Sequence, residues 1–234
     1  MTFALLLLAV AVLTVHNLGV ERLRPALYVP ACGVTAATLV CLARWNGLAL
    51  DEIGVSASGL GFGLAAGAAV LALVLVAGLL RSTRPLLADR RMAGVGPLGT
   101  AYRAAVRIPF GTVLVEEVAF RGVLLALVGG LAGTAWAVAV SSALFGLWHV
   151  VPVRATLRTN DVAVRTALVG GTVVVLALVG AGLCWLRLLA GGLAAPAIVH
   201  ASAGAGATVV AFFVVREPRR TVPNFPTEHP GPSH

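Results

Sequence analysis

Apolar residues divide this chain into long hydrophobic stretches, and short segments that carry arginine separate them. A helix needs about 17–25 mostly apolar residues to cross a bilayer, and seven stretches are long enough. His16 and Asn17 make the first stretch marginal, and Gly129, Gly130 and their neighbours alone separate the fourth from the fifth. The pattern predicts an all-α fold, a polytopic transmembrane helical bundle of about seven spans (six to eight). The stretches are residues 2–19, 26–43, 55–80, 108–129, 131–152, 166–184 and 190–215.

Composition favours a membrane protein over a soluble one. The chain is 59% hydrophobic and 11% charged, whereas an average soluble domain is about 25% charged. A soluble core of this size could not hide so much apolar surface, but lipid can. The net charge of +8 comes from 17 basic residues, all of them arginine. Because most arginines lie in short loops between apolar stretches, they indicate membrane topology, and we expect a lipid bilayer rather than nucleic acid as a partner.

The arginines are distributed unevenly between the two sets of loops. The loops after the first, third and fifth stretches and the C-terminal segment hold 14, whereas the alternate loops hold only Arg44 and Arg187. The positive-inside rule then places the N-terminus outside and the C-terminus in the cytoplasm. With five prolines and no periodicity, the C-terminal tail is expected to be disordered. The predicted parts are N-terminal spans (1–80), a basic cytoplasmic loop (81–107), a transmembrane core (108–215) and the tail (216–234).

Three ionisable side chains stand in the middle of the fourth stretch. Each costs about 2.5–3.5 kcal/mol to insert, so we expect them to pair or to function. Successive helical residues point about 100° apart, so Glu116 and Glu117 cannot share one direction. Glu117 can pair with Arg121 at i, i+4. Glu116 then lacks a local partner, and in low dielectric it suits a general acid or base. A purely structural network of the three is the alternative.

Histidines in two other stretches extend this cluster. His149 lies four residues after Phe145, and His200 lies well inside the last stretch. Two histidines and a glutamate pair on three spans predict a converging site in a cavity open to the cytoplasm. Glutamate and one histidine could polarise a water, and the second histidine could steady the oxyanion formed on an amide. Alternatively Glu116, His149 and His200 could bind zinc.

These residues form three short motifs over roughly residues 105–215. In combination the motifs resemble those of the CAAX protease and bacteriocin-processing (CPBP, or Abi) family of intramembrane proteases. The resemblance implies a helical membrane bundle with a conical cavity that faces the cytoplasm. It also implies that the protein hydrolyses a peptide bond of a peptide or membrane-protein substrate. It also makes residues 108–215 the catalytic core. The motifs are Glu116-Glu117-x-x-x-Arg121, Phe145-x-x-x-His149, and His200 after Gly191-Gly-Leu-Ala-Ala-Pro-Ala-Ile-Val.

The resemblance also implies a role for each residue. Glu116 corresponds to the glutamate that activates water, His149 to its partner, and His200 to the histidine of the oxyanion site. The supporting residues are those that complete the motifs, namely Glu117, Arg121 and Phe145. The family has been described both as metalloproteases and as glutamate-type enzymes without a required metal. No cofactor is therefore firmly implied, and we prefer the metal-free mechanism with zinc as the alternative.

One position departs from the family pattern. The third motif usually has asparagine four residues after the histidine, where this chain has Gly204, which offers no side-chain donor. Ser202 points about 200° away from His200 and is a poor substitute. Losing one oxyanion donor typically costs about 10²–10³ in rate. Slow turnover, a recruited water or lost activity are the expected consequences.

Three functions remain open from the sequence. The first is an intramembrane endopeptidase, which the intact Glu116, His149 and His200 favour. The second is a non-catalytic membrane immunity or partner-binding module, which Gly204 favours. The third is a proton-coupled transporter, which the absence of internal repeats disfavours. The arginine-only basic residues are typical of a bacterial protein, so the plasma membrane of a bacterium is the expected location.

Overall fold

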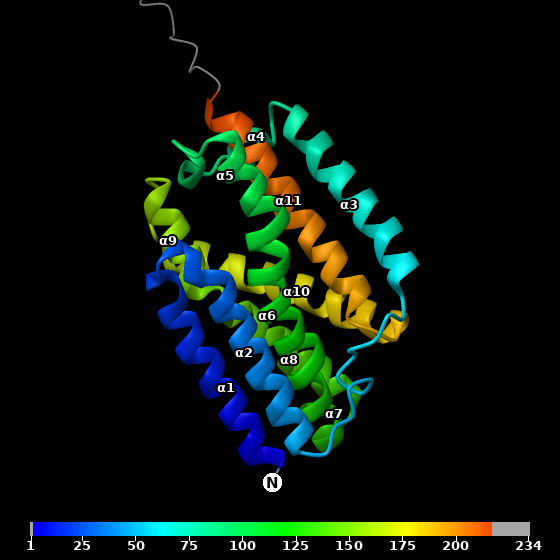
Figure 1. Ribbon diagram of the computed structural model, residues 1–234. Coiled ribbons are helices and arrows are strands. Elements are labelled where there is room, and N and C mark those ends of the chain that lie inside the picture. The colour runs from blue at the N-terminus through cyan, green and yellow to red at the C-terminus, as the bar shows by residue number, and fades with distance from the viewer. Residues whose placement is uncertain (1, 217–234) are drawn as a thin grey trace, which may run out of the picture.

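A computed structural model describes residues 2–216, and these form a bundle of helices without a strand (Figure 1). The predicted tail lies outside the described residues. Two elements are short 3₁₀-helices (η1, η2) and two are π-helices (η3, η4). In chain order the helices are α1 (Thr2–Gly19), η1 (Val20–Arg22), α2 (Pro25–Trp45), α3 (Leu60–Leu79), α4 (Arg84–Leu87), η2 (Arg90–Met92), α5 (Pro97–Tyr102), η3 (Arg103–Val113), α6 (Leu114–Glu116), η4 (Glu117–Leu124), α7 (Leu125–Ala132), α8 (Thr134–Trp148), α9 (Val150–Thr159), α10 (Thr166–Ala190) and α11 (Ala194–Arg216).

The predicted polytopic helical bundle is confirmed. Within the described residues, six helices are long and apolar enough to cross a membrane: α1, α2, α3, the α8–α9 pair, α10 and α11. The remaining predicted span, 108–129, lies in one unbroken helical run from α5 to α7. That run begins at Pro97, inside the segment expected to be a basic loop. The count of seven spans and the orientation of the termini stay predictions.

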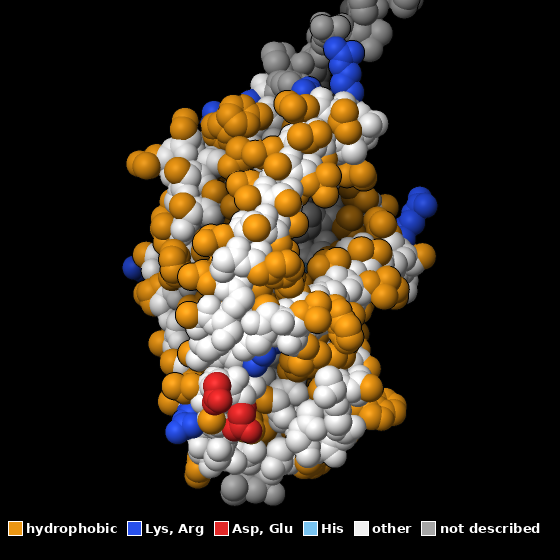
Figure 2. Space-filling view, turned by 90° about the vertical axis from the view of Figure 1, so that its right-hand side faces the viewer, with side chains coloured by type: hydrophobic (Ala, Val, Ile, Leu, Met, Phe, Trp, Pro, Cys, Tyr) orange, Lys and Arg blue, Asp and Glu red, His pale blue; other side chains and the backbone are white. Residues whose placement is uncertain are grey.

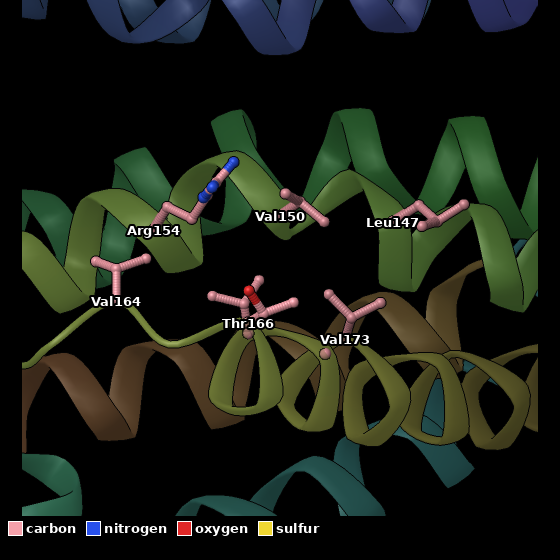
Figure 3. A pocket seen from close by; sticks show the side chains of 8 residues that line it. Leu147, Val150, Arg154, Val164, Thr166 and Val173 are labelled. Atoms are coloured by element: carbon pink, nitrogen blue, oxygen red, sulfur yellow. The ribbon is translucent and has the colours of Figure 1, made fainter.

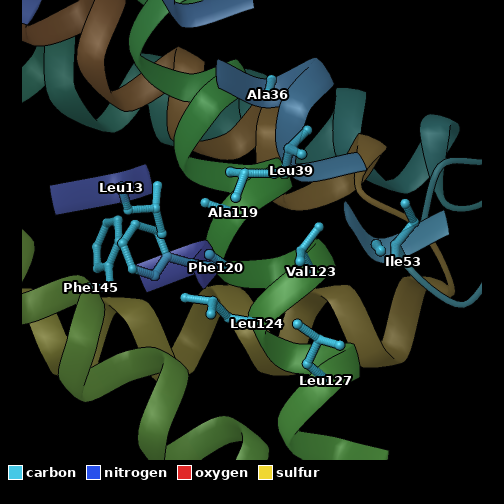
Figure 4. Close-up of a cluster of buried hydrophobic side chains, with 13 residues drawn as sticks. Leu13, Ala36, Leu39, Ile53, Ala119, Phe120, Val123, Leu124, Leu127 and Phe145 are labelled. Carbon is cyan, nitrogen blue, oxygen red and sulfur yellow. The ribbon is translucent and has the colours of Figure 1, made fainter. Parts of the chain in front are cut away.

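The run from α5 to α7 passes through the centre of the bundle as a partly π-helical rod. A π-helix closes hydrogen bonds from i to i+5, so each residue turns through a smaller angle than in an α-helix. All eight residues of η4 are buried. Its apolar side chains Ala119, Phe120 and Val123 join one core with Leu13 of α1 and Leu39 of α2 (Figure 4). The helix with the ionisable cluster is therefore enclosed by its neighbours.

Close contact between α3 and α11 depends on glycines. An ideal Cβ atom at Gly63 would lie 2.7 Å from Cα of Ala195, and one at Gly67 would lie 2.7 Å from Cγ2 of Ile198. Gly78 faces α11 in the same way. Small residues allow membrane helices to approach closely enough for dense van der Waals packing. This packing fixes the position of α11, the helix that carries His200.

Polar contacts tie together the loops at each end of the bundle. Near η2, the Arg90 backbone N–H donates to Oδ1 of Asn160 at 2.9 Å, and the Arg90 guanidinium pairs with Asp161. Arg91 lies 2.7 Å from the Asp89 carboxylate. Burial by itself raises the pKa of Asp89, but the hydrogen bonds and charge of Arg91 outweigh it and leave that pKa below its ordinary value. The α4–α5 segment is thereby joined to the α9–α10 turn.

At another loop, Arg187 near the end of α10 anchors the α2–α3 connection. Its Nη2 donates to the backbone carbonyls of Asp51 and Glu52, each at 3.3 Å. Gly54 beside it has a φ of 76°, a left-handed backbone conformation that suits glycine. The guanidinium occupies the place of a Gly54 Cβ atom. A substituted residue at Gly54 would meet both strain and Arg187.

The outer surface of the bundle is largely apolar. Figure 2 shows hydrophobic side chains over most of one face, with a few charged groups among them. Large hydrophobic residues on the outer surface of the bundle include Leu73 and Leu178, each 68% exposed, and Phe62, which is 57% exposed. Such a surface is unfavourable in water but suits contact with lipid chains.

Replacement of Gly63 by alanine should loosen the α3–α11 contact, because the new methyl group meets the backbone of α11. We expect a loss of about 1–3 kcal/mol, or roughly 2–10 °C in the thermal unfolding midpoint of the purified protein. Gly61→Ala is the matched control, since a Cβ atom there has nothing within 4 Å. Equal midpoints for the two variants would contradict the close contact.

Candidate active site

His200 of α11 contacts both glutamates of the first motif. Glu116 is 4% exposed and Glu117 is 1% exposed, at the junction of α6 and η4. The His200 Nδ1 atom lies 2.8 Å from Oε1 of Glu117, and its Nε2 atom lies 3.7 Å from Oε2 of Glu116. The two carboxylates have separate directions, but one imidazole from another helix joins them. Of the residues predicted to converge, the structure brings Glu116, Glu117 and His200 into direct contact.

The predicted Glu117–Arg121 pair is also present. Nη1 of Arg121 lies 3.1 Å from Oε1 of Glu117, and the two side chains are 0% and 2% exposed. The guanidinium carbon lies 4.0 Å from the centre of the Phe145 ring, and Nη2 lies 3.5 Å from the Gly180 carbonyl. Nε of Arg121 makes no hydrogen bond within the described residues. The charge of Arg121 is therefore balanced mainly by Glu117, and its flat face packs on Phe145.

Trp148 supplies a contact to Glu116 that sequence reasoning missed. Its indole Nε1–H donates to Oε1 of Glu116 at 3.0 Å. The other carboxylate oxygen, Oε2, is buried and has no hydrogen-bond partner in the described part of the chain. The signal in the sequence was weak: a buried indole N–H usually needs an acceptor, but nothing local indicates which one. Glu116 is thus hydrogen-bonded at one oxygen and not at the other.

His149 stands at the break between α8 and α9. Its Nδ1 atom lies 2.7 Å from the Phe145 carbonyl oxygen. Because a carbonyl only accepts, Nδ1 carries the hydrogen and a neutral His149 keeps Nε2 as an acceptor. The Phe145 ring packs edge-on against His149 at 4.6 Å and against His200 at 6.1 Å. Phe145 therefore joins the two histidines, which make no hydrogen bond to each other in residues 2–216.

The predicted zinc ligands do not gather into a three-ligand site. Among residues 2–216, no group of three or more His, Cys, Asp and Glu side chains could hold a metal ion. Nδ1 of His200 is already engaged by Glu117, which leaves that ring only Nε2 for another ligand role. Glu116, His149 and His200 do not fit a zinc ion in this arrangement, and we derive no step through a metal.

Two hollows lie beside the site, and neither is lined by Glu116, His149 or His200. One, of about 310 Å³, lies between α8–α9 and α10, and Leu147, Arg154 and Val173 are among its walls (Figure 3). The other, of about 240 Å³, lies between α1, η4 and α8, and Phe120 and Trp148 line it. Leu147 lines both. Neither hollow is therefore the conical cavity that was predicted around Glu116, His149 and His200.

Comparison with protein families agrees with the motifs. The family model described as "Type II CAAX prenyl endopeptidase Rce1-like" matches residues 99–205, a segment that includes all three motifs. Comparisons with curated proteins and with solved structures gave no match.

The apolar helices indicate an integral membrane protein, and the match supports a CAAX-type intramembrane endopeptidase at the level of the family. Residues 99–205 are similar to the Rce1-like model of the CAAX protease family, the family that the three motifs resemble. The family identified from the three motifs is confirmed.

Changing Glu117 to glutamine should destabilise the fold, because Arg121 would keep its buried charge without a partner. Such a loss typically costs about 3–5 kcal/mol, or roughly 6–20 °C in the thermal midpoint. Glu116→Gln is the control, because it leaves the Glu117–Arg121 pair intact and should cost much less. A midpoint for Glu117→Gln at or above that of Glu116→Gln would contradict the stabilising role of the Glu117–Arg121 ion pair.

Proposed function

We propose that the protein is a glutamate-type intramembrane endopeptidase of a bacterial plasma membrane. It hydrolyses a peptide bond in a peptide or membrane-protein substrate with water activated by Glu116 and His149. The observation that carries the proposal is the state of Glu116: it is buried, it accepts a hydrogen bond from Trp148 at Oε1, and its Oε2 has no hydrogen-bond partner in the described residues and lies 3.7 Å from His200 Nε2. A carboxylate with one free oxygen in a dry site is suited to accept a proton from water.

The chemistry begins with a water at the open side of Glu116. The Oε2 atom accepts a proton from this water, and Nε2 of His149 accepts the second hydrogen bond of the water. The resulting hydroxide attacks the carbonyl carbon of the substrate. Glu116, now protonated, then delivers the proton to the leaving amine nitrogen, so the peptide bond breaks and the carboxylate is restored.

His200 is the group that meets the negative charge developing on the carbonyl oxygen. Its Nδ1–H donates to Glu117, which fixes the plane of the ring. A protonated ring then presents Nε2–H to the oxyanion. Two carboxylates, the Arg121 guanidinium and this imidazolium together have no net charge, which favours such an arrangement in an apolar interior. Glu117 thus serves both Arg121 and His200.

A second candidate is a non-catalytic membrane module that binds a partner or confers immunity. Gly204 favours it, because the position one turn after His200 offers no donor for an oxyanion. The space there is also restricted: an ideal Cβ atom at Gly204 would lie 3.1 Å from Cγ2 of Ile108. Cleavage assays separate this candidate from the protease.

Replacing Glu116 by glutamine should abolish cleavage by removing the proton acceptor while retaining an acceptor oxygen for Trp148. The assay uses the detergent-purified protein and a mixed library of membrane-tethered and soluble fluorogenic peptides, each with and without a strong chelator. We expect a fall of at least about 10²-fold, with cleavage by the unchanged protein surviving the chelator.

The other outcomes have distinct meanings. Full activity of Glu116→Gln would remove Glu116 as the base. Loss with chelator and recovery with zinc would establish the metal-dependent alternative. A thermal midpoint equal to that of the unchanged protein is the control for folding. An absence of cleavage throughout the library would contradict the proposal for these substrates and favour the binding module.

Gly204→Asn should raise the cleavage rate by restoring the donor of the family's third motif. A missing oxyanion donor typically costs about 10²–10³ in rate, which sets the upper limit of the gain. Because Ile108 crowds this position, the variant is also made together with Ile108→Ala, and Ile108→Ala by itself is the control. No gain in either background would show that another donor already serves the oxyanion.

A further inference from the structure

We infer that the first helix of the bundle positions the reactive glutamate through Trp148, with His16 and Asn17 as positioning residues. This inference rests on the proposed role of Glu116 as the base. Both residues lie outside the segment that matches the protease family, 99–205. In the sequence they only weakened the prediction of a first span. In the structure they lie against the end of α8.

His16 of α1 forms one wall against the Trp148 ring. The two rings are stacked, with centroids 6.0 Å apart and planes inclined by 11°. The imidazole is itself fixed from α2: Nδ1 lies 2.8 Å from the Thr35 hydroxyl and Nε2 lies 3.8 Å from Sγ of Cys32. His16 is 9% exposed. Because both ring nitrogens of His16 have partners, the imidazole has a fixed orientation for stacking with the Trp148 indole.

Asn17 fixes the backbone of the same tryptophan. Its Nδ2 amide donates to the Trp148 carbonyl oxygen at 2.9 Å. The last carbonyls of an α-helix lack partners within the helix, and Trp148 is the last residue of α8. The next residue is His149. Asn17 therefore fixes the backbone of Trp148, whose indole extends toward Glu116. The same contact fixes the backbone next to His149, another predicted catalytic residue.

The Trp148 indole in turn orients the carboxylate of Glu116. Phe120 packs edge-on against Trp148, with ring centroids 5.7 Å apart. With its ring and backbone fixed, Trp148 keeps Nε1–H directed at Oε1 of Glu116. A hydrogen bond from an ordered donor fixes the rotation of a carboxylate, and groups behind a catalytic residue set its geometry in this way. The other oxygen is thereby kept toward His200 and the proposed water.

The decisive variant is Trp148→Phe, which keeps an aromatic ring on His16 but removes the indole N–H. The matched control is Trp136→Phe on the same helix, where the indole is 64% exposed. We expect kcat to fall about tenfold or more, as for the loss of one hydrogen bond to a charged group, with KM nearly unchanged. The control should cleave at the rate of the unchanged protein.

A spectroscopic measurement separates this inference from the proposed protease activity. Indole ¹⁵N–¹H resonances are recorded on protein labelled at its four tryptophans, and Trp148→Phe identifies the resonance of interest. Glu116→Gln should shift that resonance, and His16→Phe or Asn17→Ala should shift it as well. Neither Glu116→Gln nor the two α1 variants should move the Trp136 resonance.

The outcomes are therefore distinct. An unchanged kcat in an active Trp148→Phe protein overturns the positioning role. If the Trp148 resonance does not shift in Glu116→Gln, the hydrogen bond between Trp148 and Glu116 is overturned, whether or not any substrate is cleaved. A coupled resonance in a protein that cleaves nothing upholds the α1–Trp148–Glu116 connection and contradicts only the proposed function. Asn17→Ala, which breaks a single neutral hydrogen bond, should lower kcat less than Trp148→Phe does.

Discussion

The buried ion pair of Glu117 and Arg121 is the interaction on which the remaining structure depends. Both side chains are almost fully removed from solvent, and an unpaired charge in such a place is strongly destabilising. The neighbouring helices complete the pair: α8 supplies the Phe145 ring, α10 a carbonyl, and α11 the imidazole of His200. Helix packing and the chemistry of the site therefore share one set of contacts, because the carboxylate that balances Arg121 also orients His200.

The remaining helices act as supports for this centre. α3 lies against α11 through glycines, which fixes the depth and rotation of the helix with His200. α1 contacts Trp148 through His16, which Thr35 of α2 holds in turn, and Trp148 contacts Glu116. Catalytic groups on helices, with rotamers locked by packing and hydrogen bonds, keep their geometry better than groups on loops. The segments outside 99–205 are thus part of the site's architecture.

The sequence predicts which residues form the site and the ion pair within one helix, but it does not predict the contacts that Trp148 makes. Glu117 and Arg121 are four residues apart on one helix, so their pairing follows from helical geometry. The contact between Trp148 and Glu116 joins residues 32 positions apart, and that between Asn17 and Trp148 joins residues 131 apart. No periodicity encodes such contacts. The sequence also did not predict that η4 is a π-helix, because its apolar pattern fits an α-helix equally well.

The complete enclosure of η4 has a consequence for how the protein is made. Glu116, at the end of α6, and Glu117 and Arg121 of η4 are costly to place in lipid alone, and every residue of η4 is buried. The imidazole that meets Glu117 comes from a residue 83 positions later in the chain, so it is synthesised long after the glutamate. The contact between Glu117 and His200 cannot form until α11 has been synthesised. The surroundings of the central helix are therefore completed only late in the synthesis of the chain.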